Sequence, residues 1–315
     1  MGLASLGVTS RSSLLRGHSL VVASAVGFGV MPYFALDAYA AGLTPTALLA
    51  YRFGIAAVLI WGFLAVTGRL ELPSRRLLVA GTVLGLSYAA MSEMFFNSVR
   101  FLPPALTGLL LYAYPALVAL TTGVLARRAP SRRVLMALAL SVAGILLTVA
   151  PGQLNLGPQA ALGFAFGLAA PVIYTGYIVF SGYHAADLPA WPLTGVVTLV
   201  AAVALSIMGV STGGLQVPPP VDAWRPVLLV AVVSTVLAIS AFLAGVGLIG
   251  PTRASIISTV EPVANLLVGV LFYGYLLSAG QVVGTGLVLG GAALAMLAGR
   301  VPGAHDPHVP GAEAA

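Results

Sequence analysis

The sequence predicts an all-α integral membrane protein whose ten transmembrane helices form two inverted repeats of five. Of its 315 residues, 59% are apolar and only 7% are charged, whereas a soluble domain carries about 25% charged residues. Apolar stretches of about 20 residues, which is enough for a helix to cross a bilayer, can be placed ten times along the chain. In addition, two parts of the chain resemble each other, and each has a proline in the middle of a hydrophobic span.

The ten expected spans follow one another with short Gly- and Pro-rich breaks between them. They divide the chain into an N-terminal tail (1–18), a first repeat (19–150), a second repeat (158–299) and a C-terminal tail that we expect to be disordered (300–315). The individual spans are placed at 19–41, 45–67, 77–98, 103–126, 131–150, 158–182, 189–210, 226–248, 251–275 and 279–299.

The arginine residues set the expected orientation of these spans, because cytoplasmic loops carry an excess of basic residues. One set of alternate segments holds Arg11, Arg16, Arg69, Arg75, Arg76, Arg127, Arg128, Arg132, Arg133, Arg253 and Arg300. The opposite set holds Arg100 and Arg225. We therefore expect both termini to lie in the cytoplasm, which requires an even number of spans.

The duplication is clearest around the two broken spans. Pro104 and Pro115 of the first copy match Pro251 and Pro262 of the second with one offset, since 251 − 104 = 147 and 262 − 115 = 147. Because each copy holds five spans, an odd number, the second copy must insert upside down relative to the first. Inverted repeats with a broken helix in each copy predict a binding site between the repeats, near the bilayer midplane.

Glu261 is the leading candidate for a functional residue. It lies ten residues beyond Pro251, or about 15 Å into its span at a rise of roughly 1.5 Å per residue. Pro262 lacks an N–H and is expected to leave the Ser258 carbonyl free, and helical spacing places Ser258, Glu261 and Asn265 on one face. These groups suit an ammonium or hydroxyl group, or a proton; the alternative is a kinked packing helix whose carboxyl bonds a neighbouring hydroxyl.

The equivalent position in the first copy holds Tyr114, with Tyr112 two residues before it. Pro115 is expected to free the carbonyl of Leu111 in the same way as Pro262 does in the second copy. The tyrosine pair suits an aromatic wall of a cavity, and an ordinary helix interface is the alternative.

Four further polar residues within the expected spans complete the list of candidates, together with one tyrosine. Glu93 and Asn97 share one helical face, and Tyr88 lies a little more than one turn before Glu93. This group suits a substrate path, with a salt bridge in an outer vestibule as the alternative. Asp37 and Arg52 both belong to the outer half of the membrane, and we expect them to form a structural ion pair rather than a coupling site.

Several kinds of chemistry find no support in the sequence, and we expect neither a cofactor nor a metal. The chain has no cysteine and therefore no thiolate ligand, and a phosphate-binding loop with lysine, which ATP-driven transport would need, is also missing. The net charge of +6 comes from arginines in short loops, so membrane topology explains it better than nucleic acid does. The expected partners are a small-molecule substrate, protons and the lipid bilayer, around a monomer or homodimer. The histidines fall in loops or tails, at His18, His184, His305 and His308.

One stretch is especially specific: Gly250-Pro251-Thr252-Arg253-Ala254-Ser255, continuing to Glu261-Pro262 and Gly269, and followed by Gln281-Val282-Val283-Gly284. With its first-copy counterpart from Asn97 to Tyr114-Pro115, it resembles the EamA-type branch of the drug/metabolite transporter superfamily. The resemblance covers about residues 19–299. The chain departs from the family pattern where Gly-Glu often ends the fourth span of each copy, because Tyr275 follows Gly274 and the first copy ends in Ala126-Arg127-Arg128.

The resemblance implies a central cavity lined by spans 3, 4, 8 and 9, including Tyr114 and Glu261. It also implies export of an amino acid or a similar polar metabolite, by alternating access, across a bacterial inner membrane. An importer or exchanger of another metabolite, such as a nucleoside, nucleotide or sugar, is the alternative. Phosphate cargo would favour a basic residue in the cavity, where Arg52 is the available arginine. A membrane-embedded enzyme would need a base among Glu93, Glu261 and Asp37.

Overall fold

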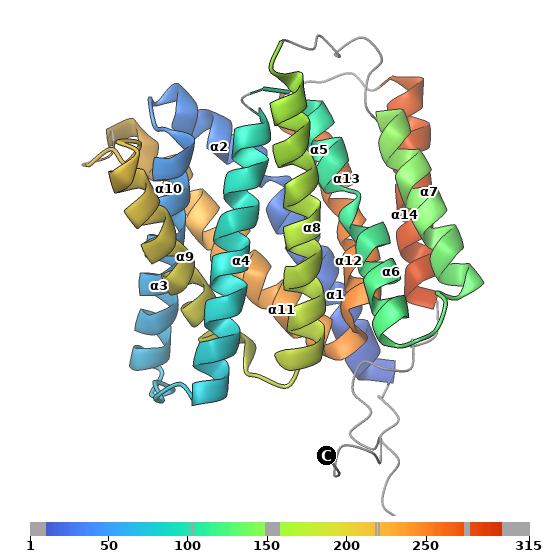
Figure 1. Ribbon diagram of the computed structural model, residues 1–315, viewed down its shortest axis with the longest axis horizontal. Coiled ribbons are helices and arrows are strands. Elements are labelled where there is room, and N and C mark those ends of the chain that lie inside the picture. The colour runs from blue at the N-terminus through green and yellow to red at the C-terminus, as the bar shows by residue number, and fades with distance from the viewer. Residues whose placement is uncertain are drawn as a thin grey trace, which may run out of the picture.

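The computed structural model describes residues 11–99, 101–102, 104–148, 158–217, 219, 221–273 and 278–297. Helices make up almost all of this part of the chain, and it contains no strand. The helices lie side by side in one bundle with their connections at its two ends (Figure 1). The prediction of an all-α fold is therefore confirmed.

The described helices fall into ten consecutive segments, of which six are single helices and four are broken. The single helices are α3 (Pro45–Val66), α4 (Arg75–Val99), α7 (Arg132–Thr148), α8 (Ala160–His184), α9 (Ala190–Ser211) and α14 (Ala279–Leu297). The broken segments in the first half are α1 (Arg11–Gly29) with α2 (Met31–Ala40), and α5 (Pro104–Leu111) with α6 (Tyr114–Leu125). Those in the second half are η1 (Val221–Ala223), α10 (Trp224–Ala231), η2 (Val232–Leu237) and α11 (Ala238–Ile249), and then α12 (Pro251–Ile257), η3 (Ser258–Val260) and α13 (Glu261–Tyr273).

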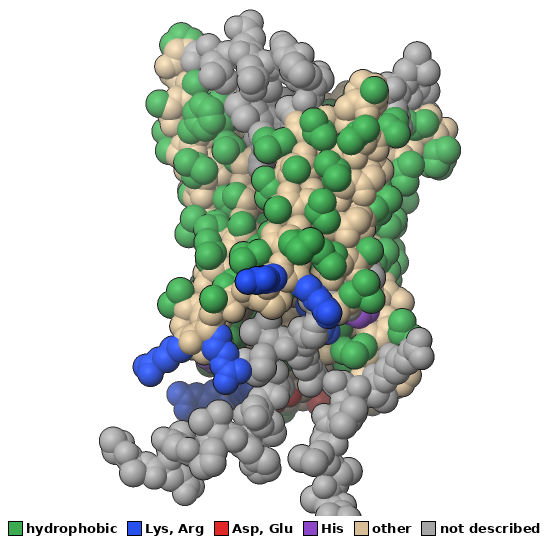
Figure 2. Space-filling view, turned by 90° about the vertical axis from the view of Figure 1, so that its right-hand side faces the viewer, with side chains coloured by type: hydrophobic (Ala, Val, Ile, Leu, Met, Phe, Trp, Pro, Cys, Tyr) green, Lys and Arg blue, Asp and Glu red, His purple; other side chains and the backbone are tan. Residues whose placement is uncertain are grey.

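The outer surface of the bundle suits a lipid environment. Seven of the helical segments are long and apolar enough to cross a membrane, and shorter apolar helices accompany them at Tyr114–Leu125 and Ala279–Ala295. Hydrophobic side chains are spread over the face of the molecule that Figure 2 shows, and arginines gather near one end of it. We call this the arginine-rich end, and its exposed arginines lie in the α3–α4 and α6–α7 connections and near the starts of α1, α4 and α7: Arg16, Arg69, Arg75, Arg76, Arg127, Arg128, Arg132 and Arg133.

The helix boundaries agree with the expected spans to within a few residues, except at the first span. This span begins at Arg11 instead of residue 19, so residues 11–18, which we assigned to the tail, are helical. These residues are too polar to be recognised as part of an apolar span, but tertiary packing holds them: Gly17 lies against Leu248 and Ile249 of α11. The expectations for residues 1–10 and for the tail at 300–315 concern positions outside the described residues.

The helix contacts have the symmetry of an inverted repeat. Under that symmetry the first span corresponds to the sixth and the third to the eighth, and α4 packs along α8 just as α1 packs along α11. The second and fifth spans each pack against their own copies, α3 on α9 and α7 on α14. The two-repeat architecture thus follows from contacts between residues far apart in the chain.

Candidate functional site

The fourth and ninth spans break at matching positions. Tyr114 and Pro115 are the first two residues of α6, and Glu261 and Pro262 are the first two residues of α13. Proline is well tolerated in the first turn of a helix, where its missing N–H has no intrahelical partner to lose. Each proline therefore starts a new helix within its span, as the sequence predicts. The two broken spans also contact each other, through α6 and α12.

Glu261 lies at the second break and is half-buried. The Tyr112 hydroxyl, from the turn between α5 and α6, is hydrogen-bonded to its carboxyl. The Ser258 carbonyl is not free, as we had expected from Pro262, because it accepts the N–H of Glu261 in a 3-10 turn. The hydrogen bond spans three residues instead of the four of an α-helix, and in this way the Ser258 carbonyl is satisfied before the proline. The polar groups left at the break are side chains.

Two of these side chains have unsatisfied hydroxyls. Tyr114 is 1% exposed and Ser258 is 5% exposed, and their hydroxyls lie close to each other across the two breaks. Neither hydroxyl has a hydrogen-bond partner of standard geometry among the described residues. A buried hydroxyl without a partner costs free energy, about 1–3 kcal/mol. A ligand that pairs with Tyr114 or Ser258 would recover part of this cost.

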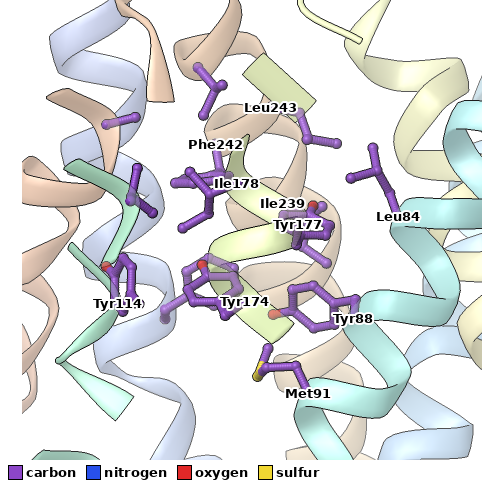
Figure 3. Close-up of a cluster of buried hydrophobic side chains, with 14 of the residues drawn as sticks. Leu84, Tyr88, Met91, Tyr114, Tyr174, Tyr177, Ile178, Ile239, Phe242 and Leu243 are labelled. Atoms are coloured by element: carbon purple, nitrogen blue, oxygen red, sulfur yellow. The ribbon is translucent and has the colours of Figure 1, made fainter. Parts of the chain in front are cut away.

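Three tyrosines from three helices form a row beside this site (Figure 3). Tyr88 of α4 and Tyr174 of α8 have ring centroids 6.4 Å apart, and Tyr174 and Tyr114 of α6 are 4.8 Å apart in an edge-on arrangement. Tyr177 and Phe242 stack near Tyr174, at 5.8 and 6.5 Å. All three residues of this tyrosine row are within electrostatic range of the Glu261 carboxyl.

Sequence reasoning did not assign Tyr174, Tyr177 or Phe242 to the site. They lie on α8 and α11, in spans without a membrane-embedded charge, so nothing in the local pattern distinguished them from packing residues. The spacing of three residues between Tyr174 and Tyr177 does place both rings on one face of a helix, and this was the available signal. The structure brings them together with Tyr88 and Tyr114, which we had predicted as site residues.

Asn265 has a different environment from Glu261. Its side-chain Nδ2 donates to the backbone carbonyl of Gly29 at 3.0 Å, and its backbone carbonyl accepts a hydrogen bond from the Tyr33 hydroxyl at 2.9 Å. Both contacts fasten α13 to the break between α1 and α2. The 3-10 turn at Ser258–Val260 changes the register of Ser258 relative to α13, which contains both Glu261 and Asn265. A role for Asn265 in the site stays a prediction.

Glu93 and Asn97 interact with each other along α4. Asn97 Nδ2 donates to the Glu93 carbonyl at 2.9 Å and to its Oε2 at 3.3 Å, as their shared face predicts. Both side chains are half-buried, and Glu93 Oε1 has no partner among the described residues. Tyr88, which we had grouped with them, belongs instead to the tyrosine row. A role for Glu93 and Asn97 in a substrate path remains a prediction.

The expected ion pair between Asp37 and Arg52 does not form. Asp37 is exposed on α2, whereas Arg52 is 2% exposed and its Nη1 lies 2.8 Å from the sulfur of Met31. The salt bridge found in the described part of the chain joins Arg76 to Asp187 at the arginine-rich end. The break at Val30 turns α2 so that Met31, and not Asp37, covers the guanidinium.

The two ends of the bundle are packed differently around the site. At the arginine-rich end, α6 contacts α12, the hydroxyls of Thr122 and Thr252 are 2.7 Å apart, and Pro251 fits against Gly182, where an added Cβ would lie 2.7 Å from the ring. The symmetry-related contact at the opposite end would join α5 to α13, and these described helices make no comparable contact. Among the described residues, the main contact between the two broken spans therefore lies at the arginine-rich end.

The described residues contain no group of three or more His, Asp or Glu side chains arranged to hold a metal ion. What the site offers is one carboxyl group, several hydroxyls and aromatic rings. These groups can bind an ammonium group, a hydroxyl or a proton, and they can pack against an apolar side chain.

Comparison with known proteins gives a consistent result. The model of the EamA-like transporter family matches residues 15–150 and 161–297. An uncharacterized transporter of Bacillus subtilis (strain 168), YcbK, is 27% identical over 258 residues, which cover 79% of this chain and 82% of that protein. An uncharacterized transporter of Archaeoglobus fulgidus is 26% identical over 279 residues, which cover 89% of this chain and 96% of that protein.

A solved structure described as "Crystal structure of protein" has the same fold. It superposes with a TM-score of 0.78 at 21% sequence identity, covering 91% of this chain and 99% of the other. At this identity the similarity concerns the fold alone. Each of the two family matches contains two of the four broken segments, so the family comparison and the contact symmetry divide the chain at the same place.

Proposed function

Because the chain belongs to the EamA-like transporter family, we propose that it is a secondary transporter that exports an amino acid or a similar small polar metabolite. The observation that carries this proposal is the position of Glu261. Its half-buried carboxyl lies at a helix break between the two repeats, beside the hydroxyls of Tyr112, Tyr114 and Ser258. A carboxyl at membrane depth is costly and is characteristic of substrate or proton pathways.

In this proposal Glu261 binds the ammonium group of the substrate or exchanges it for a proton. The carboxyl supplies a charge-assisted hydrogen bond, and the unpaired hydroxyls of Tyr114 and Ser258 supply further donors and acceptors. The rings of Tyr88, Tyr174 and Tyr114 offer an aromatic surface to the cation or to an apolar side chain. The substrate that matches this set of groups best is an amino acid with both polar and apolar parts.

The unequal packing of the two ends supports alternating access as the mechanism. The contact between α6 and α12 closes the arginine-rich end, and α5 and α13 lack the equivalent contact. If α6 and α12 separated while α5 and α13 came into contact, the site would close to one side and open to the other, as inverted repeats permit. By the positive-inside rule, the arginine-rich end would face the cytoplasm of a bacterial cell, with both termini on that side of the inner membrane.

Flux measurements in proteoliposomes test the proposal. The purified protein is reconstituted, and efflux of each of the twenty amino acids is followed with and without a pH gradient. We expect at least one amino acid to be transported, with a rate that depends on the gradient. Glu261→Gln should abolish the flux or remove its pH dependence, while Glu71→Gln, the same substitution at an exposed loop position, should leave it unchanged.

Two results would contradict the proposal. Transport of none of the twenty amino acids by the wild type would exclude the substrate class. An unchanged flux with unchanged pH dependence in Glu261→Gln would exclude the central role of this carboxyl. Reversing the gradient in the same vesicles determines whether export or import is the faster direction.

A further inference from the structure

Arg52 is a buried guanidinium without a carboxylate partner. It lies on α3, about 10 Å from the start of the helix at a rise of roughly 1.5 Å per residue, and is 2% exposed. No salt bridge to it occurs among the described residues, and Asp37, the expected partner, is exposed. A buried charge is normally paired, so the environment of Arg52 calls for an explanation.

The groups around Arg52 leave its hydrogen-bonding capacity largely unused. Its Nη1 is directed to the sulfur of Met31 at 2.8 Å, and a thioether is a weak acceptor. Its Nε has no partner among the described residues. The Phe53 ring lies 4.4 Å from the guanidinium carbon and provides an attraction that does not consume a donor. A guanidinium with free N–H groups in a fixed fork is a receptor for a carboxylate or a phosphate.

Arg52 is also connected to the candidate site. The Tyr88 hydroxyl lies close to the guanidinium, and the Tyr88 ring lies 6.0 Å from the guanidinium carbon. Tyr88 is one end of the tyrosine row that leads past Tyr174 to Tyr114 (Figure 3). All three tyrosines of this row are within electrostatic range of the Glu261 carboxyl. A cation and a carboxyl therefore lie near the same row of aromatic rings.

We propose that Arg52 binds the carboxylate of the transported molecule, so that the site selects amino acids over the corresponding amines and amides. This proposal rests on the proposed function and adds a second recognition group to it. A bound carboxylate would accept the Nε–H, which has no partner among the described residues, together with the N–H of Nη2 beside it. A single guanidinium matches the single charge of a carboxylate better than the double charge of a phosphate. The other arginine that is buried among the described residues, Arg253, lies in α12 at the arginine-rich end.

Selectivity for the carboxylate is the quantity that tests this role. Flux of each of the twenty amino acids into proteoliposomes is measured first. For each transported amino acid, the concentration that inhibits this flux by half is then compared between the unlabelled amino acid, its C-terminal amide and the amine that lacks the carboxyl group. For the best-transported amino acid, we expect the wild type to prefer the acid at least tenfold. Arg52→Met, which keeps an unbranched apolar side chain, should reduce this ratio to near one.

Two variants separate recognition from folding. Arg52→Lys keeps the charge but loses the fork, and we expect an intermediate ratio of about three. Arg225→Met, at an exposed arginine of α10, should keep the wild-type ratio. Thermal unfolding is measured for each variant, since a purely structural arginine would lower the amount of folded protein without changing the ratio.

The outcomes distinguish this proposal from the proposed function. Amino-acid flux with equal preference for acid and amide in the wild type would overturn the role of Arg52 without any variant being needed. A tenfold preference that persists in Arg52→Met or Arg52→Lys would overturn it as well, and would leave the transporter proposal intact. Absence of flux for all twenty amino acids would overturn both.

Discussion

The Thr122 hydroxyl of α6 lies 2.7 Å from the Thr252 hydroxyl of α12, and this buried hydrogen bond joins the two repeats at the arginine-rich end. Thr122 also bonds the carbonyls of Val118 and Ala119 in its own helix. The pair lies where α6 and α12 close one side of the site. It therefore belongs to the contacts that would have to separate if that side opens.

Thr122→Val should weaken this closure. The substitution keeps the shape of the side chain and leaves the Thr252 hydroxyl without its partner, and a neutral hydrogen bond contributes about 0.5–1.5 kcal/mol. The open fraction at the arginine-rich end should rise about 2- to 10-fold. Because the chain has no cysteine, a single Ser258→Cys substitution can be labelled from that end with a membrane-impermeant maleimide in oriented vesicles.

Thr67→Val is the control for this measurement, because the Thr67 hydroxyl is exposed and bonds only to carbonyls of its own helix among the described contacts. Its labelling rate should match that of the parent. A labelling rate in Thr122→Val equal to that of the control would show that the hydroxyl pair does not hold the end closed.

Tyr112→Phe should alter transport without unfolding the protein. The substitution removes the hydroxyl that is hydrogen-bonded to Glu261 and keeps the ring. Loss of a hydrogen bond to a carboxylate costs about 1.5–3 kcal/mol, so kcat/KM for flux should fall about 10- to 100-fold and its pH profile should shift. Tyr183→Phe, at a half-buried position on α8, is the matched control. If both variants transport alike, Tyr112 has no role beyond packing.

Gly29→Ala should destabilise the contact between α1 and α13. An added Cβ would lie 2.6 Å from the Glu261 carbonyl and 2.7 Å from Cβ of Ala264, so one helix must move. Overpacking of this kind costs about 1–3 kcal/mol, and the thermal unfolding temperature in detergent should fall. Gly62→Ala, on α3 with nothing within 4 Å of the added Cβ, should be neutral or stabilising. Equal unfolding temperatures for the two variants would contradict the close approach.

The Arg76–Asp187 salt bridge should contribute little to stability despite its bidentate geometry, with contacts of 2.7 and 2.8 Å. Its side chains are 56% and 43% exposed, and exposed pairs contribute about 0.2–1 kcal/mol. A double-mutant cycle with Arg76→Met and Asp187→Asn should give a coupling energy below about 1 kcal/mol that decreases at high salt. A larger coupling that is independent of salt would mean that the pair is shielded by neighbouring groups.

Much of the architecture could be predicted from the sequence because it follows from local properties. Apolar stretches long enough to cross a bilayer mark helices, and the matched positions of Pro115 and Pro262 mark the breaks. Both α6 and α13 indeed begin one residue before these prolines. The start of α1 was missed for the opposite reason, because polar residues 11–18 are held as helix by packing against α11 and not by their own hydrophobicity.

The site could be predicted only in part. Tyr112, Tyr114, Ser258 and Glu261 lie together at the two helix breaks that the prolines marked. Tyr88, which the sequence grouped with Glu93 and Asn97, lies instead beside Tyr174. Tyr174 and Tyr177 carried only the signal of their three-residue spacing, which places both rings on one helical face. The partners of Arg52, Asn265 and Asp37 could not be predicted, because they depend on how α1, α2 and α13 are rotated about their axes. Rotating one helix changes which of its residues face the neighbouring helix.

The sequence by itself determined that this chain is helical, spans a membrane, is duplicated, and carries a carboxyl at one of two matched helix breaks. These properties depend on hydrophobicity, proline chemistry and the spacing of residues within one segment. Only the tertiary structure decided that Arg52 contacts Met31, that Tyr88, Tyr174 and Tyr114 form one row, and that Thr122 meets Thr252 at one end of the bundle. These contacts join residues 21 to 130 positions apart, and their geometry is set by helix packing, which no local pattern encodes.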